Sequence, residues 1–503
     1  MLGVFIFLSM LKLSKAYTCL GGCNCSTDVV TSGIEVYCRG KNMHRIPAEA
    51  LAREAWGSVV IDFGLNELSA LPANAFRGQT KLKRLILDHN DIEKVDPACF
   101  NATDRAWEPR KSPLEYINMR DNHLHFIPPC FGKTATSVSE LTNLRTLYLG
   151  GNKLGNTPES DSLVGVPNVQ DLDLSRNLMP KLPELFLKKL PKLLYLDISI
   201  NKITKLPRSV LGRTVQLLTL SANGNMFRSI PQKLPTSLIE IQLANNAIKN
   251  LTSLDMDALY DLEHLVVLDL SGNGIEFIFN GVFSRLANLK VLDLSQNSLD
   301  SVSAATFDGL RNLEALFLQN NPTLNYIPAT TFTNLPRLKY LFLYGCGLRS
   351  VSIPDTGLNV KYIWLFGNPL NCNCRLVSLA MYLQTSKVIL DSGLEKLEVD
   401  TGNPRGDAAV RVKLNSIRVK IMPTICVSPT NRHRSVVGIP VAKIPVGSLT
   451  CPDEPVYIIV SVFLGIICFA LSVPVVFCLV GAYLLVLKLG KTKFGWKLND
   501  EDE

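Results

Sequence analysis

Apolar and polar positions follow one short pattern that recurs along most of the chain. The pattern is L-x-x-L-x-L-x-x-N-x-L, and thirteen copies of it run from about Ser58 to Leu370. The clearest copies are residues 265–275 and 289–299. The Asn position recurs at residues 66, 90, 122, 152, 177, 201, 223, 246, 273, 297, 321, 346 (where it is Cys) and 368. Each L-x-L core predicts a short strand whose Leu side chains point inward.

The spacing of the copies predicts how they assemble. Most steps are 22 to 27 residues, a period typical of the leucine-rich repeat. One such unit cannot bury its apolar edge alone, so neighbouring units stack into a curved solenoid. We therefore predict an α/β repeat solenoid over residues 58–370, a leucine-rich-repeat horseshoe with a parallel concave sheet. This shape offers a long concave surface and no obvious catalytic pocket.

Two apolar stretches of another kind lie near the ends of the chain. Residues 2–11 are almost wholly apolar and are followed by small residues, which predicts a signal peptide over 1–16. No Lys or Arg precedes this run, so an uncleaved anchor is the alternative. Residues 456–487 carry no charge over 32 residues. As a helix they would exceed the roughly 20 residues that span a bilayer, so we predict one transmembrane helix.

The charges beside this segment predict its orientation. Lys488, Lys491 and Lys493 follow it, whereas Asp453 and Glu454 precede it. The positive-inside rule then places residues 488–503 in the cytosol as a short tail. The expected location is the plasma membrane, as a type I single-pass protein with an extracellular N-terminus. The net charge of +8 over 503 residues is modest and does not suggest nucleic-acid binding.

Most cysteines cluster on either side of the repeats. In an exported chain such clusters predict disulfide frameworks. The groups Cys19-x3-Cys23-x-Cys25-x12-Cys38 and Cys372-x-Cys374, with later Cys426 and Cys451, resemble the terminal caps of extracellular leucine-rich-repeat proteins. The caps would cover residues 17–57 and 371–451. The resemblance implies the pairs Cys19–Cys25, Cys23–Cys38, Cys372–Cys426 and Cys374–Cys451. It also implies an adhesion or recognition receptor rather than an enzyme.

Three further cysteines and three glycosylation sequons lie elsewhere. Cys99 and Cys130 follow Asn90 and Asn122 at nearly equal offsets, which predicts neighbouring positions on the convex face and a disulfide, with two buried thiols as the alternative. Cys346 replaces a repeat Asn and is predicted to be a buried free thiol. The N-x-S/T sequons predict glycosylation at Asn24, Asn101 and Asn250.

Aromatic residues gather on the last three strands of the array. Alternate residues of a strand face opposite sides, so with Leu inward the outward residues are Phe317, Tyr340, Phe342, Tyr344, Tyr362, Trp364 and Phe366. An exposed apolar patch of this kind predicts a partner-binding site. The alternative is that the long insertion in the C-terminal cap, residues 394–420, folds over these rings and covers them.

Candidate catalytic chemistry is sparse. The chain contains no G-x-S-x-G, no H-E-x-x-H and no phosphate-binding loop, so we expect no enzyme activity and no cofactor. His89, His123 and His125 are interpreted as surface residues rather than metal ligands. Asp173, Asp197, Asp269 and Asp293 recur at one strand position and are interpreted as part of the repeat consensus, with an acidic ligand-binding column as the alternative.

The sequence therefore predicts a cell-surface protein that recognises or adheres to an extracellular protein through its repeats. The alternative is an auxiliary subunit or co-receptor that regulates a channel or receptor through its transmembrane and juxtamembrane parts. A basic stretch from Arg405 to Lys443, in which only Asp407 is acidic, would serve that second role.

Overall fold

The computed structural model describes most of the chain up to residue 390. The described residues are 16–28, 33–55, 57–100, 112–132, 141–155, 158–159, 161–207, 211, 216–353, 360–371, 376–385 and 389–390. The predicted signal peptide (1–16, except Ala16), transmembrane helix (456–487) and tail (488–503) lie outside them. So do Asn101 and the four cysteines of the C-terminal cap, Cys372, Cys374, Cys426 and Cys451. Among the described helices, none is long and apolar enough to cross a membrane.

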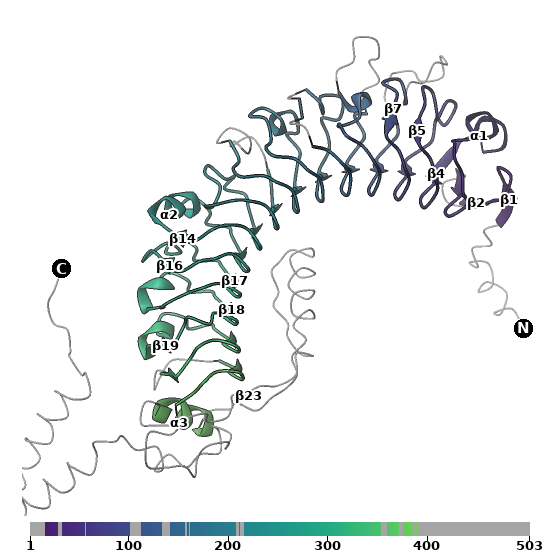
Figure 1. The fold of residues 1–503 in the computed structure, drawn as a ribbon. Helices are drawn as coiled ribbons and strands as arrows, with labels where there is room; N and C mark the ends of the chain where they lie inside the picture. The colour runs from purple at the N-terminus through teal and green to yellow at the C-terminus, as the bar shows by residue number, and fades with distance from the viewer. Residues whose placement is uncertain are drawn as a thin grey trace, which may run out of the picture.

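The repeats wind into a curved solenoid whose concave side is a parallel sheet (Figure 1). One strand corresponds to each predicted repeat: β4 (Ser58–Asp62), β6 (Arg84–Ile86), β8 (Tyr116–Asn118), β9 (Thr146–Tyr148), β10 (Asp171–Asp173), β11 (Tyr195–Asp197), β12 (Thr219–Ser221), β13 (Glu240–Gln242), β15 (Val267–Asp269), β17 (Val291–Asp293), β18 (Ala315–Phe317), β20 (Tyr340–Phe342) and β22 (Tyr362–Trp364). A further short strand, β23 (Ile389–Leu390), pairs in parallel with β22. The repeats therefore form the leucine-rich-repeat horseshoe that the sequence predicts.

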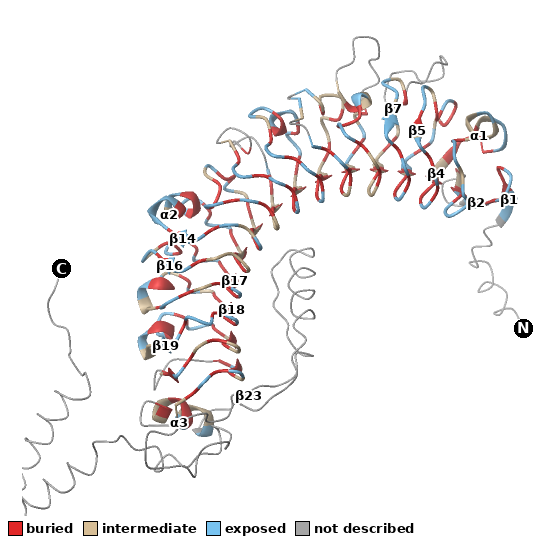
Figure 2. Cartoon of the chain, in the orientation of Figure 1, coloured by how far each residue is buried: buried red, intermediate tan, exposed pale blue. Residues whose placement is uncertain are grey.

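The strands pair in register, so equivalent residues of successive repeats stack. Leu268 pairs with Leu292, and Leu292 pairs with Leu316. All three leucines are fully buried in one core that runs along the solenoid (Figure 2). Because the Leu side chains point inward, the residues on either side of each one point to the concave surface.

The convex side contains little helix. It carries the short strands β5 (Ala70–Leu71), β7 (Lys94–Val95), β14 (Asn250–Leu251), β16 (Phe277–Ile278), β19 (Tyr326–Ile327) and β21 (Ser350–Val351). It also carries α2 (Ser253–Leu259) and the 3-10 turns η1 (Pro129–Phe131), η2 (Leu187–Lys189), η3 (Ala304–Thr306) and η4 (Ala329–Phe332). The described part is thus a β-solenoid more than the α/β solenoid we predicted. Its short connections leave room for turns and strand pairs rather than full helices.

The recurring Asn residues hold neighbouring repeats together. Asn297 donates from Nδ2 to the carbonyl oxygens of Leu270 and Leu294, at 3.1 and 2.9 Å, and accepts from the amide of Ile275 at 3.0 Å. A buried amide that satisfies donors and acceptor in this way fixes the turn after each strand. Cys346 takes the same position with its thiol 3.2 Å from the carbonyl oxygen of Leu318.

One predicted Asn position is wrong. In the seventh repeat the buried residue that makes these bonds is Asn225, which donates to Ile198 O and accepts from Ile203 N at 2.9 and 3.0 Å. Asn223 lies two residues earlier, on the concave side, and its Nδ2 donates to the Gln242 side chain at 2.9 Å. The sequence Asn223-Gly224-Asn225 offered two candidates, and only the position of Leu220 and Ala222 in the strand selects the second.

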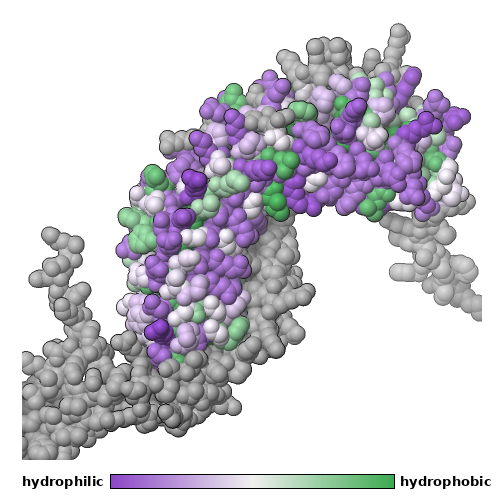
Figure 3. Space-filling model, in the orientation of Figure 1, coloured by the Kyte–Doolittle hydropathy of each residue, from purple (hydrophilic) through white to green (hydrophobic). Residues whose placement is uncertain are grey.

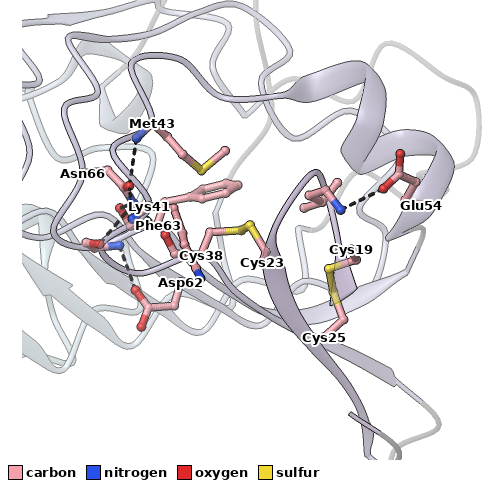
Figure 4. Close-up of a disulfide and its surroundings, with 12 residues drawn as sticks. Cys19, Cys23, Cys25, Cys38, Lys41, Met43, Glu54, Asp62, Phe63 and Asn66 are labelled. Carbon is pink, nitrogen blue, oxygen red and sulfur yellow. Dashed lines mark hydrogen bonds between the residues drawn. A yellow bond between two sulfur atoms is a disulfide. The ribbon is translucent and has the colours of Figure 1, made fainter. Parts of the chain in front are cut away.

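The N-terminal end of the solenoid is closed by a small disulfide-bonded cap (Figure 4). Its strands β1 (Ala16–Cys19), β2 (Cys23–Asp28) and β3 (Gly33–Tyr37) pair in antiparallel order, β1 with β2 and β2 with β3, and β3 pairs in parallel with β4. Disulfides join Cys19 to Cys25 and Cys23 to Cys38, which confirms the pairs that the resemblance implied. The helix α1 (Ala48–Glu54) covers the outer side, and at the other end α3 (Val377–Thr385) packs onto the last repeats.

Candidate recognition surface

The outward-facing residues of the parallel strands form three columns along the concave surface. The residues before and after the central Leu of each strand supply two columns, and the residue two positions farther on supplies the third. The seven predicted aromatics all belong to these columns, because the register pairs Phe317 with Phe342 and Phe342 with Trp364. The strand parity assumed from the sequence is therefore correct.

The aromatics form stacked columns. The Phe342 ring lies between those of Phe317 and Trp364, with centroids 4.4 and 4.2 Å away and planes within 8° and 1° of parallel. Beside this column, the Tyr344 and Phe366 rings stack at 4.7 Å and those of Tyr340 and Tyr362 at 5.6 Å. Together with Val267, Val291 and Ala315 they make a second apolar cluster, separate from the solenoid core.

This C-terminal aromatic cluster is largely buried. Phe342 and Trp364 expose 0% of their surface and Phe317 exposes 1%, while Tyr344, Tyr362 and Phe366 are half-buried. Burial also raises the pKa of Tyr344 to about 12. The rings therefore present little area to a partner in this structure. Partner binding by this cluster stays a prediction, and the segment that we expected as the alternative cover, residues 394–420, lies outside the described residues.

The N-terminal half of the same surface is polar and carries a ladder of Arg and Tyr side chains. Arg84 lies over the Tyr116 ring at 4.8 Å, and Arg120 lies over the Tyr148 ring at 3.9 Å. The two Tyr rings meet edge to face at 5.6 Å. Arg120 also donates from Nε to Asp173, two repeats further along. The flank of these repeats, seen from the side in Figure 3, is also mainly hydrophilic. We call Arg84, Tyr116, Arg120 and Tyr148 the Arg–Tyr ladder.

A chain of charges runs beside the Arg–Tyr ladder from the cap into the fifth repeat. Arg39 donates to both carboxylate oxygens of Asp88, at 2.7 and 3.0 Å. His89 Nδ1 lies 2.8 Å from Asp88, and its Nε2 lies 3.5 Å from Asp121. Arg176 closes the chain at 3.1 Å from Asp121. Bidentate Arg–carboxylate contacts orient both groups, so this edge of the surface has a defined arrangement of charges.

The electrostatics of Asp88 follow from these contacts. Burial by itself raises the pKa of this carboxyl, but hydrogen bonds from Arg39 and His89 outweigh it and hold the pKa below the usual value of 3.8. Asp88 is therefore ionised at neutral pH and keeps Arg39 in place.

The Arg–Tyr ladder was not among the site residues predicted from the sequence. The parity rule that identified the C-terminal aromatics applies equally to Arg84-Leu85-Ile86 and Tyr116-Ile117-Asn118. It would have placed Arg84 and Tyr116 on the concave surface. The signal in the sequence was thus the strand parity itself, whereas the density of aromatic residues points to the half of the surface that is buried.

The recurring Asp residues serve the turns of the repeats. Asp173 and Asp293 accept hydrogen bonds from the amides of Ser175 and Ser295, each at 2.8 Å. Asp197 and Asp269 do the same with Ser199 and Ser271, at 2.8 and 2.9 Å. This contact shapes the turn after each strand and supports the consensus interpretation. Within the described residues, no group of three His, Cys, Asp or Glu side chains is arranged to hold a metal ion.

The three other cysteines among the described residues, Cys99, Cys130 and Cys346, carry thiols. Cys99 and Cys130 lie side by side, as their offsets predicted, but the predicted disulfide is not formed and both are free. Burial raises the pKa of Cys99 well above its ordinary value, and a hydrogen bond to Cys130 adds to this rise. The nearly equal offsets place the two segments in neighbouring repeats but do not fix the sulfur atoms at bonding distance. Cys346 is a buried free thiol, as predicted.

The described sequons lie at the surface. Asn24 is exposed in β2, between the two disulfide cysteines of that strand. Asn250 is exposed in β14 on the convex side. The glycosylation of either residue stays a prediction.

Comparison with a family model identifies the repeats. The model described as "Leucine rich repeat" matches residues 236–299, 263–323 and 287–348. These segments contain the strands from β13 to β20, and the strands on the N-terminal side repeat the same unit with the same Asn bonds.

Known proteins with similar sequences match this chain over part of their length. Mouse osteomodulin is 28% identical over 180 residues, which are 35% of this chain and 36% of that protein. Rat lumican is 28% identical over 33% of this chain and 48% of its own length. Zebrafish leucine-rich repeat-containing protein 3 is 32% identical over 34% of this chain and 66% of its length. The chain thus spans half or less of the first two relatives.

Solved structures share the fold at low sequence identity. A chain of the glycosylated Toll–Spatzle complex of Drosophila matches with a TM-score of 0.56 and 17% identity, covering 82% of this chain and 54% of that one. A chain of the octameric complex of Latrophilin 3, Unc5D and FLRT2 matches with a TM-score of 0.51 and 20% identity, covering 85% and 99%. Residues 236–348 thus match the leucine-rich-repeat family, and the described part of the chain folds as a leucine-rich-repeat horseshoe with a disulfide-bonded N-terminal cap.

Proposed function

We propose that this chain is a cell-surface recognition protein that binds an extracellular protein through the N-terminal half of its concave surface. The observation that carries the proposal is the Arg–Tyr ladder. Tyr and Arg are enriched among the residues that dominate protein–protein binding energy. Here the rings and guanidinium groups hold one another in place before any partner arrives, which reduces the entropy lost on binding.

The comparisons support a protein partner. The two solved structures with the similar fold are a complex of Toll with Spatzle and a complex of Latrophilin 3, Unc5D and FLRT2. The N-terminal disulfides fit an oxidising, extracellular environment. We propose plasma-membrane anchoring as a type I single-pass protein because of residues 456–487. The alternative of an auxiliary subunit rests on the same segment, and no observation on the described residues favours it.

The test is cell binding by the soluble ectodomain, residues 17–454, displayed as a multimer on a panel of cell types. Three double variants locate the site: Arg84→Ser/Tyr116→Ser in the Arg–Tyr ladder, Phe342→Ser/Trp364→Ser in the aromatic cluster, and Tyr260→Ser/Arg285→Ser as the matched control. The control removes another Arg–Tyr contact, with the guanidinium carbon 4.6 Å from the ring centroid, on the convex side. All four proteins are first checked for folding by circular dichroism.

We expect the parent and the convex control to bind and the ladder variant to lose binding by about tenfold or more, since each dominant side chain contributes roughly 2 kcal/mol. Loss only in the folded aromatic variant would move the site to the C-terminal half. Equal binding by all forms would exclude both halves of the concave surface. No binding to any cell type would favour the auxiliary-subunit alternative.

A further inference from the structure

The convex flank of repeats eight and nine places a glycosylation sequon beside two exposed phenylalanines. The sequon is Asn250-Leu251-Thr252, and its first two residues form β14. The next repeat supplies Phe277 and Ile278 as β16, and the parallel register pairs Asn250 with Phe277 and Leu251 with Ile278. Leu251 and Ile278 are buried whereas Asn250 and Phe277 are exposed. The Asn250 side chain and the Phe277 ring therefore point to the same side.

The second phenylalanine extends this surface. The amide of Phe279 donates to the carbonyl oxygen of Leu251 at 2.8 Å, so Phe279 follows Phe277 along the same flank. Phe277 exposes 55% of its surface and Phe279 exposes 41%. A Cβ added at the neighbouring Gly274 would meet nothing within 4 Å. Two adjacent, exposed rings beside open space are an apolar surface that the protein itself does not cover.

The groups of the sequon are arranged for a glycan. No described group hydrogen-bonds to the Asn250 amide, so Nδ2 is available. The Thr252 hydroxyl caps α2 by accepting from the amide of Leu254 at 3.3 Å, and it also donates to Asp255 at 3.0 Å. Once folded, the hydroxyl is thus used by the helix, whereas the amide faces solvent next to the Phe277 ring.

We propose that Asn250 carries an N-linked glycan whose first N-acetylglucosamine packs on Phe277 and Phe279. The reaction replaces the lipid pyrophosphate of an oligosaccharide donor: the bond from Nδ2 to the sugar C1 forms, the bond from C1 to the pyrophosphate oxygen breaks, and Nδ2 loses a proton. The C–H face of the attached sugar covers the rings, whose electron-rich faces attract its polarised C–H groups. This flank is then closed to protein partners, which leaves the concave surface for recognition. The inference rests on the export of the chain, as in the proposed function.

The test uses the full-length chain expressed in cells that retain high-mannose glycans. Site occupancy is measured at Asn24, Asn101 and Asn250 by mass spectrometry after complete release under denaturing conditions. The rate of release at Asn250 by peptide-N-glycosidase is then measured on the native protein. Two variants are compared with the parent: Phe277→Ser/Phe279→Ser and Tyr326→Ser. Tyr326 is the matched control because it begins β19 at the position equivalent to Phe277 and exposes 42% of its surface.

We expect Asn250 to be occupied, and its glycan to be released several-fold faster from the native Phe277→Ser/Phe279→Ser variant than from the parent or Tyr326→Ser. Equal rates in all three forms overturn the packing. Occupancy at Asn101 or Asn24 but not at Asn250 overturns this inference and leaves export intact. No occupancy at any sequon overturns the inference together with the proposed export.

A second measurement needs no substitution and holds even where the variant misfolds. Endoglycosidase H leaves one N-acetylglucosamine on Asn250, whereas peptide-N-glycosidase removes it. We expect the melting temperature of the parent to be unchanged by the first enzyme and lowered by about 1–2 °C by the second. Identical melting temperatures after both treatments contradict the packing of the first sugar.

Discussion

The two halves of the concave surface belong to one parallel sheet but have opposite character. In the C-terminal half, the outward positions hold Phe317, Phe342 and Trp364, whose rings stack on one another and are buried. In the N-terminal half, the equivalent strands carry the Arg–Tyr ladder, whose members are half-buried or exposed. The comparison teaches that a dense apolar patch in a repeat array contributes to the structure, while a sparser polar one remains available to a partner.

The largest expected difference between the halves is in stability. Trp364→Ala should lower the free energy of unfolding by about 3–5 kcal/mol, because it removes a fully buried ring and leaves a cavity. Tyr116→Ala should cost about 1 kcal/mol, since its ring is partly in water already. Urea denaturation of the soluble ectodomain, followed by circular dichroism, measures both. Similar losses for the two variants would show that the halves do not differ in this way.

Two substitutions near the junction between the halves test whether Asn225 or Asn223 is the structural Asn of the seventh repeat. Asn225→Ala should destabilise the protein by about 2–3 kcal/mol, because it leaves the Ile198 carbonyl and the Ile203 amide without their partner. Asn223→Ala removes contacts at the half-buried concave side and should cost about 1 kcal/mol or less. The midpoints of urea unfolding compare the two variants. The reverse order would restore Asn223 as the structural position.

Lowering the pH should reduce the stability of the N-terminal half, because Asp88 becomes protonated. Its folded-state pKa lies below 3.8, so its ionised form stabilises the fold above the unfolded-state pKa, and this contribution is lost as the pH falls through the folded-state pKa. Asp88→Asn should therefore lower the melting temperature at pH 7 and have little effect at a pH below the folded-state value. Thermal unfolding across this range measures the difference. An effect of Asp88→Asn that persists unchanged in acid would mean that packing, and not the charge, is responsible.

The smallest expected effect on stability concerns Glu240, which lies next to the junction between the halves. Its substitution should raise the melting temperature, whereas that of Asp88 should lower it. Burial raises the pKa of Glu240 above 4.5, so ionisation opposes folding above the folded-state pKa, and this penalty disappears below the unfolded-state value. Glu240→Gln should raise the melting temperature slightly at pH 7 and leave it unchanged once the pH is below 4.5. Differential scanning fluorimetry at the two pH values is sufficient. A lower melting temperature at neutral pH would show that the charged carboxylate accepts the bond from Gln242, at 2.6 Å, more favourably than a neutral amide oxygen does.

Much of the architecture could be predicted because the same spacing of Leu and Asn residues recurs in every repeat. The Leu spacing predicted the strands and their inward faces, and twelve of the thirteen Asn or Cys positions were correct. The exception, Asn223, arose where two Asn residues lie two positions apart, so the local pattern was ambiguous. The disulfides Cys19–Cys25 and Cys23–Cys38 followed from resemblance to a known cap.

The candidate site was less predictable, because the exposure of a side chain depends on which other residues pack against it. The parity of Phe342 and Trp364 was correct, yet their burial could not be read from their own strands. The proximity of Cys99 and Cys130 was also correct, but bond formation requires sulfur positions that a sequence offset does not give. Asn250 and Phe277 are 27 residues apart in the chain, and only the register of β14 and β16 shows that they pair.

By itself, the sequence determined the repeat, the direction of its Leu side chains, the cap cysteines and the inward and outward faces of each strand. These are consequences of local spacing, because every strand obeys the same period of two and every turn the same Asn. The tertiary structure alone decided which outward residues are buried, which cysteines remain thiols and which side chains from different repeats meet. Those outcomes depend on side chains that are distant in sequence, so the pattern within one repeat does not determine them.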